Sequence, residues 1–316
     1  MRRIDPLVQM LMASIVLATV LPVSGGWRYV AQFASNAAVF LLFFLNGLRL
    51  HRHEIMAGLG NHRLLWPLTL WVFGVMPAAG WAVWQSGGGW MPPLVALGFL
   101  FLGTLPSTVQ SATAYSSLAG GNVASSVVAA ALLNILGTFI TAPLFSALAS
   151  GASASFDSDG LVKVAVILLL PFFLGQIMQG QLGGWVKAHR GLVTVMDRTS
   201  IAIAVYVAFS GAVAQGIWGR VDGFGWLALG IGCAIMLVIG YGGAWALGGL
   251  LGLPRGDRIS MLFAGAQKSI AMGAPLATVL FAPAAAGVIL LPVLVYHLVQ
   301  LIVSAPLAAR LNRTCL

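Results

Sequence analysis

Two apolar stretches of this chain carry polar side chains at their centres. The first is GTLPSTVQSATAYSSLAGGN, residues 103–122, and the second is GAQKSIAMGAP, residues 265–275. Hydroxyl, amide and ammonium groups can coordinate an ion or contact a polar solute, so these stretches predict a binding site. The candidate site residues are Ser107, Thr108, Gln110, Ser111 and Thr113 in the first stretch, and Gln267, Lys268 and Ser269 in the second.

The composition around these stretches predicts an all-α polytopic membrane protein. Hydrophobic residues make up 59% of the 316 residues and charged residues 7%, and the mean hydropathy is +0.97. Apolar runs long enough to cross a bilayer recur from one end of the chain to the other. The two cysteines, Cys233 and Cys315, are too few to indicate a disulfide framework, a metal site or a redox compartment.

We expect ten transmembrane helices. Their approximate ranges are 7–23, 30–48, 64–84, 93–119, 123–149, 161–180, 199–217, 225–251, 259–282 and 284–308. Ten spans put both termini on one side of the membrane, and the connections on that side hold twelve of the sixteen Lys and Arg residues. This excess predicts a protein of the inner (plasma) membrane with both termini in the cytoplasm. The net charge of +9 is then explained by topology, and we expect no nucleic-acid partner.

The polar connection SGASASFDSDG, residues 150–160, leaves five spans on each side. Because five is odd, the second half enters the membrane in the opposite orientation to the first. Residues 1–150 and 151–316 are therefore predicted to form two inverted five-helix repeats, a plan common in secondary transporters.

The two polar stretches lie in the fourth span of each half. Proline lacks a backbone donor and glycine weakens a helix, so both spans are predicted to be interrupted. The residues concerned are Gly103 and Pro106 in the first span, and Gly265, Gly273 and Pro275 in the second. Two broken helices in matching positions predict a binding site near the middle of the membrane. A proline kink stabilised by neighbouring hydroxyls is the alternative.

Three motifs of the chain resemble a known family. They are LLFFLNGLRL (41–50), LPSTVQSATAYSSLAGGNVASSVVAAALLNILGTFITAPL (105–144) and AGAQKSIAMGAPLATVLF (264–281). They are similar to the bile acid:sodium symporter superfamily, and more closely to its divergent SBF-like branch, over essentially the whole chain. The resemblance implies a panel domain from spans 1, 2, 6 and 7 and a core domain from spans 3–5 and 8–10. Broken helices 4 and 9 would cross in the core, and core and panel would move against each other to give alternating access.

The resemblance also implies a set of ion ligands. In symporting members, sodium is held by polar residues of helices 4 and 5, by a Glu and a Gln at the helix 9 break, and by a Gln on helix 3. The matching positions in this chain are Gln110, Ser111, Thr113, Asn134 and Gln267. The family pattern E-x-G-x-Q reads FAGAQ at 263–267, so Phe263 stands where the glutamate is expected, and Val72 aligns with the helix 3 glutamine. Both departures affect one sodium site, so ordinary two-sodium symport is in doubt.

Lys268 is the one Lys, Arg, Asp or Glu that we expect deep inside a span, since all seven acidic residues fall at predicted span ends or in connections. A buried charge without an opposite partner is costly and usually functional. Lys268 could occupy the position of a sodium ion, coordinated by carbonyl groups and by Gln267, Gln110 and Asn134. It could also face an anionic substrate, or carry a coupling proton by reversible deprotonation. A permanent cap on the carbonyls of a broken helix is the structural alternative.

Two further motifs carry weaker signals. His297 and Gln300 share one face of the last span, where His297 is explained as a satisfied interior histidine, and a proton relay is the alternative. The run RLHRHE (49–54) places His53 beside Glu54, but it lacks further spaced ligands and is better explained as a positively charged cytoplasmic anchor than as a metal site.

These observations favour a secondary active transporter for a small organic, anionic solute. An ion channel or a cation/proton exchanger using the same broken helices is the alternative. An intramembrane enzyme is a poor fit, because the spans offer no nucleophile paired with a base and no metal-ligand set. We expect no cofactor and leave the coupling ion open between sodium and a proton. The expected partners are a small-molecule substrate and the lipid bilayer, and a monomer suffices, although a homo-oligomer stays open.

Overall fold

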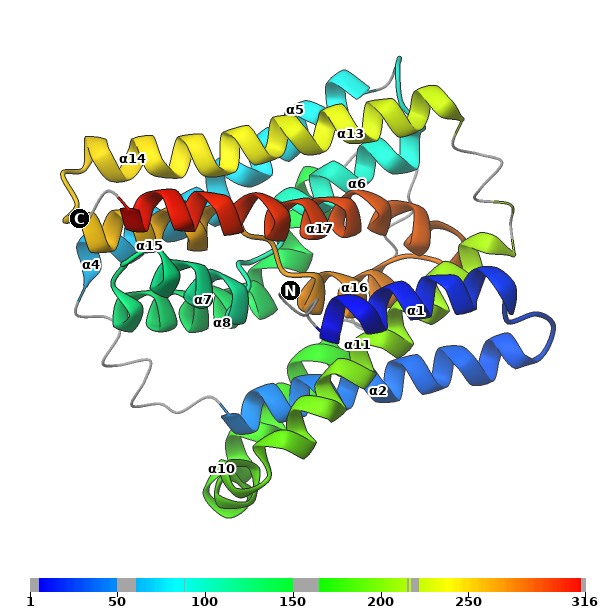
Figure 1. Cartoon of the computed structure of the whole chain (residues 1–316). Coiled ribbons are helices and arrows are strands. Elements are labelled where there is room, and N and C mark those ends of the chain that lie inside the picture. The colour runs from blue at the N-terminus through cyan, green and yellow to red at the C-terminus, as the bar shows by residue number, and fades with distance from the viewer. Residues whose placement is uncertain are drawn as a thin grey trace. The chain divides into compact units, whose positions relative to one another are not determined.

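The computed structural model describes residues 6–49, 61–87, 89–149, 165–214, 216 and 222–313, and every regular element within them is a helix (Figure 1). In this part of the chain 7 helices are long and apolar enough to cross a membrane. They are Trp27–Arg49, His62–Gly87, Val123–Leu148, Val166–Ala188, Arg190–Val213, Gly223–Leu250 and Pro283–Asn312, and two shorter apolar helices are Pro6–Val20 and Pro93–Thr104. The prediction of an all-helical, multi-pass membrane protein is confirmed. The full set of ten spans stays a prediction, and the connection 150–160 lies outside the described residues.

The helices form two compact units, each built from segments of both halves of the chain. The first unit comprises Met1–His51, Ser150–Asp222 and Ala271–Leu290, and the second comprises Arg52–Ala149, Gly223–Ile270 and Leu291–Leu316. The panel and core domains implied by the resemblance are sets of membrane spans that would move against each other. The described helices establish neither the ten spans nor such a movement, so the two domains stay a prediction.

In the first unit, α2 is the central packing partner. The helices are α1 (Pro6–Val20), α2 (Trp27–Arg49), η2 (Ala165–Leu169), α10 (Leu170–Ala188) and α11 (Arg190–Val213). α2 packs against both α10 and α11, and α1 packs against α11. Gly47 and Gly175 allow the close approach of α2 and α10, because a Cβ atom on either would collide with main-chain oxygen of the facing helix.

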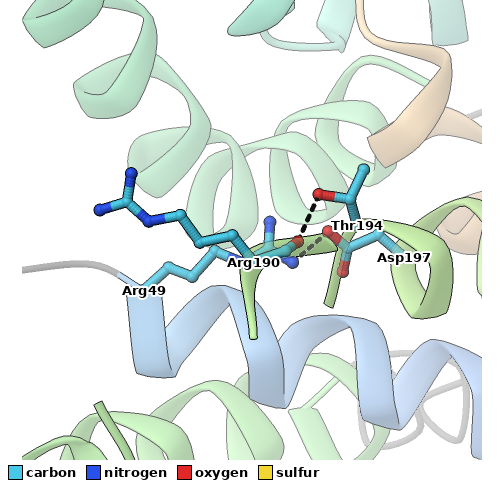
Figure 2. A network of polar contacts seen from close by, with 4 residues as sticks. All are labelled: Arg49, Arg190, Thr194 and Asp197. Atoms are coloured by element: carbon cyan, nitrogen blue, oxygen red, sulfur yellow. Dashed lines mark hydrogen bonds and ion pairs between the residues drawn. The ribbon is translucent and has the colours of Figure 1, made fainter. Parts of the chain in front are cut away.

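An ion pair between Arg49 and Asp197 joins α2 to α11 in this unit, as Figure 2 shows. Within α11, the Thr194 hydroxyl donates to the main-chain oxygen of Arg190 at 2.8 Å. α11 begins at Arg190, whereas the sequence predicted a span that begins near residue 199. The polar residues that precede the apolar part of the helix are helical too. Asp197 therefore lies within a candidate membrane span and not at a span end or in a connection, which corrects the expectation from the sequence.

The second unit contains two long helices that each include a π-helical turn. α4 (His62–Leu70), η1 (Trp71–Val75) and α5 (Met76–Gly87) follow one another without a gap. α13 (Gly223–Val238), η3 (Ile239–Gly243) and α14 (Ala244–Leu250) do the same. π-Helical turns insert an extra residue and often occur at functional sites.

The same unit holds non-helical residues at the two places where the sequence predicts an interrupted span. α6 (Pro93–Thr104) is separated from α7 (Gln110–Leu118) by five non-helical residues, 105–109. Leu105 has φ −69° and ψ 146°, the extended conformation that a following proline imposes. α8 (Val123–Leu148) follows α7.

The second interruption has a different cause from the one expected. α15 (Arg255–Ala266) is followed by α16 (Ile270–Leu280), and Gln267 between them is extended, with φ −78° and ψ 141°. Pro275 lies inside α16 and Gly265 inside α15, so neither marks the interruption at 267–269. Hydrogen bonds to the last helix, α17 (Pro283–Arg313), hold these residues instead.

Glycines bring the helices around these interruptions close together. A Cβ atom on Gly103 would lie 2.6 Å from the main-chain oxygen of Met76, so α6 can lie against α5 only with glycine at this position. Trp71 of η1 is buried in a space left by Gly243 and Gly265, since a Cβ atom on either glycine would meet its ring. These contacts fix η1 beside the end of α15.

A buried carboxylate fixes the start of α15. Asp257 accepts hydrogen bonds from the amides of Asn61 at 2.9 Å and Asn122 at 2.8 Å. Asn61 directly precedes α4, and Asn122 caps α8 by accepting from the main-chain N–H of Ser125. The carboxylate therefore ties together the beginnings of three helices.

Candidate ion and substrate site

Lys268 is fully buried, and its ammonium is held by main-chain oxygens. Its Nζ atom lies 2.7 Å from the oxygen of Leu105, 2.8 Å from that of Gly103 and 3.4 Å from that of Val72. The first two oxygens are at the carboxyl end of α6, where the helix dipole carries partial negative charge, and the third belongs to η1. The ammonium thus occupies a site with the charge and the ligands that suit a small cation.

Every main-chain oxygen from Gly103 to Ser107 accepts a hydrogen bond from another element. A buried carbonyl without a donor would be costly in a membrane, so this segment requires such partners. Lys268 Nζ donates to the oxygens of Gly103 and Leu105, and Thr141 Oγ1 donates to that of Thr104 at 3.1 Å. Ser269 N donates to the oxygen of Pro106 at 2.9 Å, and Asn134 Nδ2 donates to that of Ser107 at 3.1 Å. The protein itself therefore satisfies the carbonyl groups of the first interruption.

Gln267 connects the two polar stretches through its side chain. Its Oε1 atom accepts from the hydroxyls of Thr108, at 2.6 Å, and Ser111. Its Nε2 atom donates to the hydroxyl of Ser304 on α17 at 3.1 Å. Residues separated by more than a hundred positions thus meet at one buried amide.

One stripe of α17 contacts three successive residues at the second interruption. Tyr296, Gln300 and Ser304 are four residues apart, so they lie on the same face of the helix. The Tyr296 hydroxyl donates to the main-chain oxygen of Ala266 at 2.5 Å, and Gln300 contacts the main chain of Lys268. Ser304, which contacts Gln267, also contacts the Tyr241 hydroxyl at 2.6 Å. Sequence reasoning missed Ser304, Tyr241 and Thr141, although the spacing of four in α17 was a usable signal.

The structure brings His297 and Gln300 into direct contact. The Nε2 atom of Gln300 lies 2.8 Å from Nδ1 of His297, and both side chains are buried. Gln300 reaches the main chain of Lys268 and not its ammonium. A relay of protons through this pair stays a prediction.

The amides expected around the Lys268 ammonium do not coordinate it. Gln110 is exposed, and among the described residues its side chain makes no hydrogen bond. Asn134 donates to the main-chain oxygens of Ser107 and Ala130, and Gln267 binds hydroxyls. The hydroxyl of Thr113 is buried and has no hydrogen-bond partner within the described part of the chain. The ligands of the ammonium are carbonyls alone, which corrects the expected set.

The other candidate from the sequence, RLHRHE at 49–54, lies outside the described residues except for Arg49. In the ranges that the structure describes, no group of three or more His, Cys, Asp or Glu residues could hold a metal ion.

Helices of membrane-spanning length around a polar site made of helix ends are typical of a membrane transporter. The chain matches the family model described as "SBF-like CPA transporter family (DUF4137)" over residues 5–313, and it belongs to this family. This confirms the resemblance to the SBF-like branch. The chain is accordingly a transporter and not an enzyme.

Comparison with individual proteins supports the same assignment. The chain is 38% identical to the Pseudomonas aeruginosa protein named "Uncharacterized protein PA2026", over 96% of this chain and 91% of the relative. It is 37% identical to an Escherichia coli protein named "Putative symporter YfeH", over 99% and 94%. It is 23% identical to "Sodium/bile acid cotransporter 7" of Mus musculus, over 90% and 85%.

Proposed function

We propose that this protein is a secondary active transporter that moves a small organic, anionic solute by alternating access, and that the ammonium of Lys268 takes the place of a coupling cation. The observation that carries the proposal is the placement of Nζ, fully buried and within 2.8 Å of two main-chain oxygens at the end of α6. By the resemblance, sodium-coupled members hold the ion with polar side chains of helices 3, 4, 5 and 9, and Lys268 directly follows one of the matching positions, Gln267.

The two departures from the family pattern support this role. Val72, which aligns with the sodium-binding glutamine of helix 3, offers its main-chain oxygen to Nζ at 3.4 Å. Phe263, which stands where the glutamate is expected, packs its ring against those of Tyr115 and Tyr241. Both changes remove a side-chain oxygen that sodium-coupled members, by the resemblance, use as an ion ligand. A sodium ion about 4 Å from the ammonium would be repelled by about 4 kcal/mol at an effective dielectric constant near 20.

The helix order supports ten spans in two inverted repeats. The 7 long helices leave three predicted spans, which correspond to α1 and to the pairs α6–α7 and α15–α16. The π-helical turns η1 and η3 fall in the third span of each half, and the interruptions fall in the fourth. This matched order is what two repeats of one ancestral unit would give. We propose that each interrupted pair is one broken membrane span.

The charge of the site supports an anionic solute. Among the described residues, the partners of the Lys268 ammonium are main-chain oxygens, and no carboxylate balances its charge. A solute with a carboxylate or a similar group would supply that balance. The name of the mouse relative pairs sodium with bile acid, but for this chain we propose the anionic character alone.

The test is uptake by the purified protein in proteoliposomes, using a panel of small organic anions. Thermal stabilisation of the protein by each compound selects those worth labelling, because a ligand that binds the folded state raises the melting temperature. We expect saturable uptake and counterflow, in which unlabelled solute inside accelerates entry of labelled solute. Uptake that neither saturates nor shows counterflow would indicate a channel and would contradict the proposal.

A further inference from the structure

The carboxamide of Gln300 contacts both main-chain polar groups of Lys268. Its Oε1 atom accepts from the N–H of Lys268 at 2.8 Å, and its Nε2 atom donates to the carbonyl of Lys268 at 3.1 Å. Gln300 is fully buried. One side chain from α17 thus replaces the two hydrogen bonds that a helix would have given to Lys268.

Residues 267–269 depend on this replacement because nothing in their own sequence ends a helix. No proline or glycine occurs among them. Gln267 N still donates to the oxygen of Phe263, as at a helix end, and Ser269 N donates to the oxygen of Pro106. Only the Gln300 amide meets the N–H of Lys268, the residue in between. The position of Lys268 therefore depends on Gln300.

The orientation of the Gln300 amide follows from the main chain. An N–H group must face an acceptor and a carbonyl must face a donor, so Oε1 lies against the N–H of Lys268 and Nε2 against its carbonyl. The flipped amide would set two donors against each other. The second hydrogen on Nε2 is then directed at Nδ1 of His297, 2.8 Å away. Nδ1 must accept, so the proton of the neutral His297 ring is on Nε2.

We infer that Gln300 is the positioning residue of Lys268, and that His297, as the Nε2–H tautomer, holds Gln300 in place. The carboxamide fixes the main chain from which the Lys268 side chain extends to the oxygens of Gly103 and Leu105. The inference rests on the proposed function of Lys268 as an internal cation. It gives His297 and Gln300 a role in placing that cation, since Gln300 contacts the main chain of Lys268 and His297 contacts Gln300.

The first test measures the chemical reactivity of the Lys268 amine and needs no substrate. The chain has three lysines, so replacing Lys163 and Lys187 by arginine leaves Lys268 as the one lysine. An amine-reactive acylating reagent is applied to this protein in nanodiscs, and labelling of the peptide that contains residue 268 is followed by mass spectrometry. We expect slow labelling, and an acceleration of about tenfold in Gln300→Leu, because loss of one buried hydrogen-bonding partner shifts populations by that order.

A matched control is available in the first unit. Gln176 is also a glutamine whose Nε2 donates to a main-chain oxygen of another helix, that of Gly47. Gln176→Leu removes a similar amide, and we expect it to leave labelling of Lys268 unchanged. Gln300→Glu keeps the acceptor for the Lys268 N–H and loses the donor for its carbonyl, so labelling should be intermediate. Equal labelling in Gln300→Leu and Gln176→Leu would overturn the inference.

The second test measures the protein with residue 300 unaltered. Nitrogen NMR of the ¹⁵N-histidine-labelled protein reports which ring nitrogen carries the proton, and His297→Gln identifies the signals of His297. We expect Nε2 of His297 to be protonated and Nδ1 to be unprotonated. A proton on Nδ1 of the neutral ring would contradict the positioning network. A sodium requirement for uptake would instead refute the proposed role of Lys268, and the labelling rates and the His297 tautomer would still be as expected. Failure of the proposed function can therefore be distinguished from failure of the positioning inference.

Discussion

The Nζ atom of Lys268 lies 2.7 Å from the main-chain oxygen of Leu105, a residue 163 positions away in the sequence. This contact joins a residue between α15 and α16 to the residue that directly follows α6. We propose that it puts a full positive charge where, by the resemblance, sodium-coupled members of the family would hold their ion. The expectations for ion coupling follow from it.

Transport should not require sodium. With an ammonium already on the carbonyls of Gly103 and Leu105, a sodium ion would be repelled from the same ligands. Uptake of a transported anion is measured in sodium and in choline buffer at one pH. We expect equal rates, and we expect Lys268→Ala to abolish coupled uptake while the protein still folds. Lys187→Ala, which removes an exposed lysine near the end of α10, is the control and should keep the wild-type rate. A steep sodium dependence in the wild type would return Lys268 to a structural role.

A side chain at position 103 should displace α6. A Cβ atom there would lie 2.6 Å from the oxygen of Met76, closer than real Cβ atoms come. Gly103→Ala should lower the melting temperature and reduce uptake, because the main-chain oxygen of Gly103, a ligand of the Lys268 ammonium, would move with α6. Gly180→Ala in α10 is the matched control, since a Cβ atom there meets nothing within 4 Å. That control should be neutral or stabilising by about 0.5–1 kcal/mol. Equal melting temperatures and uptake rates in Gly103→Ala and Gly180→Ala would show that the close packing of α6 against α5 affects neither stability nor transport.

Removing the carboxylate of Asp257 should destabilise the second unit. Asp257→Ala leaves the amides of Asn61 and Asn122 without their acceptor, at a cost of about 0.5–1.5 kcal/mol for each hydrogen bond lost. Asn61→Ala and the double variant complete a thermodynamic cycle, measured by thermal unfolding in detergent. We expect the double variant to be less destabilised than the sum of the single variants, because both remove one interaction. Strict additivity would show that the 2.9 Å contact carries no coupling energy.

Both termini should be accessible from the cytoplasm alone, with the connection 150–160 on the outside. Lys and Arg are concentrated in the connections that ten spans would place inside, which sets the orientation. The measurement is a pair of reporters, one active only in the cytoplasm and one only outside, fused in turn to each terminus and inserted at 155. A reporter active outside at either terminus would contradict the ten-span topology.

The sequence predicted the helices and the first interruption because both have local causes. Apolar runs leave the helix as the main way to satisfy the backbone in a bilayer, and Pro106 forces Leu105 out of the helical region. The second interruption was attributed to Pro275 and glycines, but α16 accommodates Pro275, and the main-chain N–H of Lys268 donates to the Gln300 amide instead of to the preceding helical turn. A tertiary contact of this kind leaves no mark on residues 267–269 themselves.

The candidate site was predictable in its centre and not in its surroundings. Lys268 stood out because a charge inside an apolar stretch is rare, and Gln267 because it matched the family pattern. The partners of the ammonium could not be predicted, because every residue has a carbonyl group and only the fold selects which three are used. The polar start of α11, with Asp197, was missed because hydropathy marks the apolar part of a helix and not its end.

A cation held by main-chain oxygens also has a consequence for mutational scanning of this protein. The side chains of Val72 and Leu105 do not touch the ammonium through any polar atom, so exchanges among apolar residues of similar size there should be silent. Sensitivity should instead concentrate at positions that donate to the same segment, such as Thr141 and Asn134, and at Gln300. Val72 and Leu105, whose main-chain oxygens bind the charge, would thus tolerate replacement, whereas Thr141, Asn134 and Gln300, which never contact it, would not.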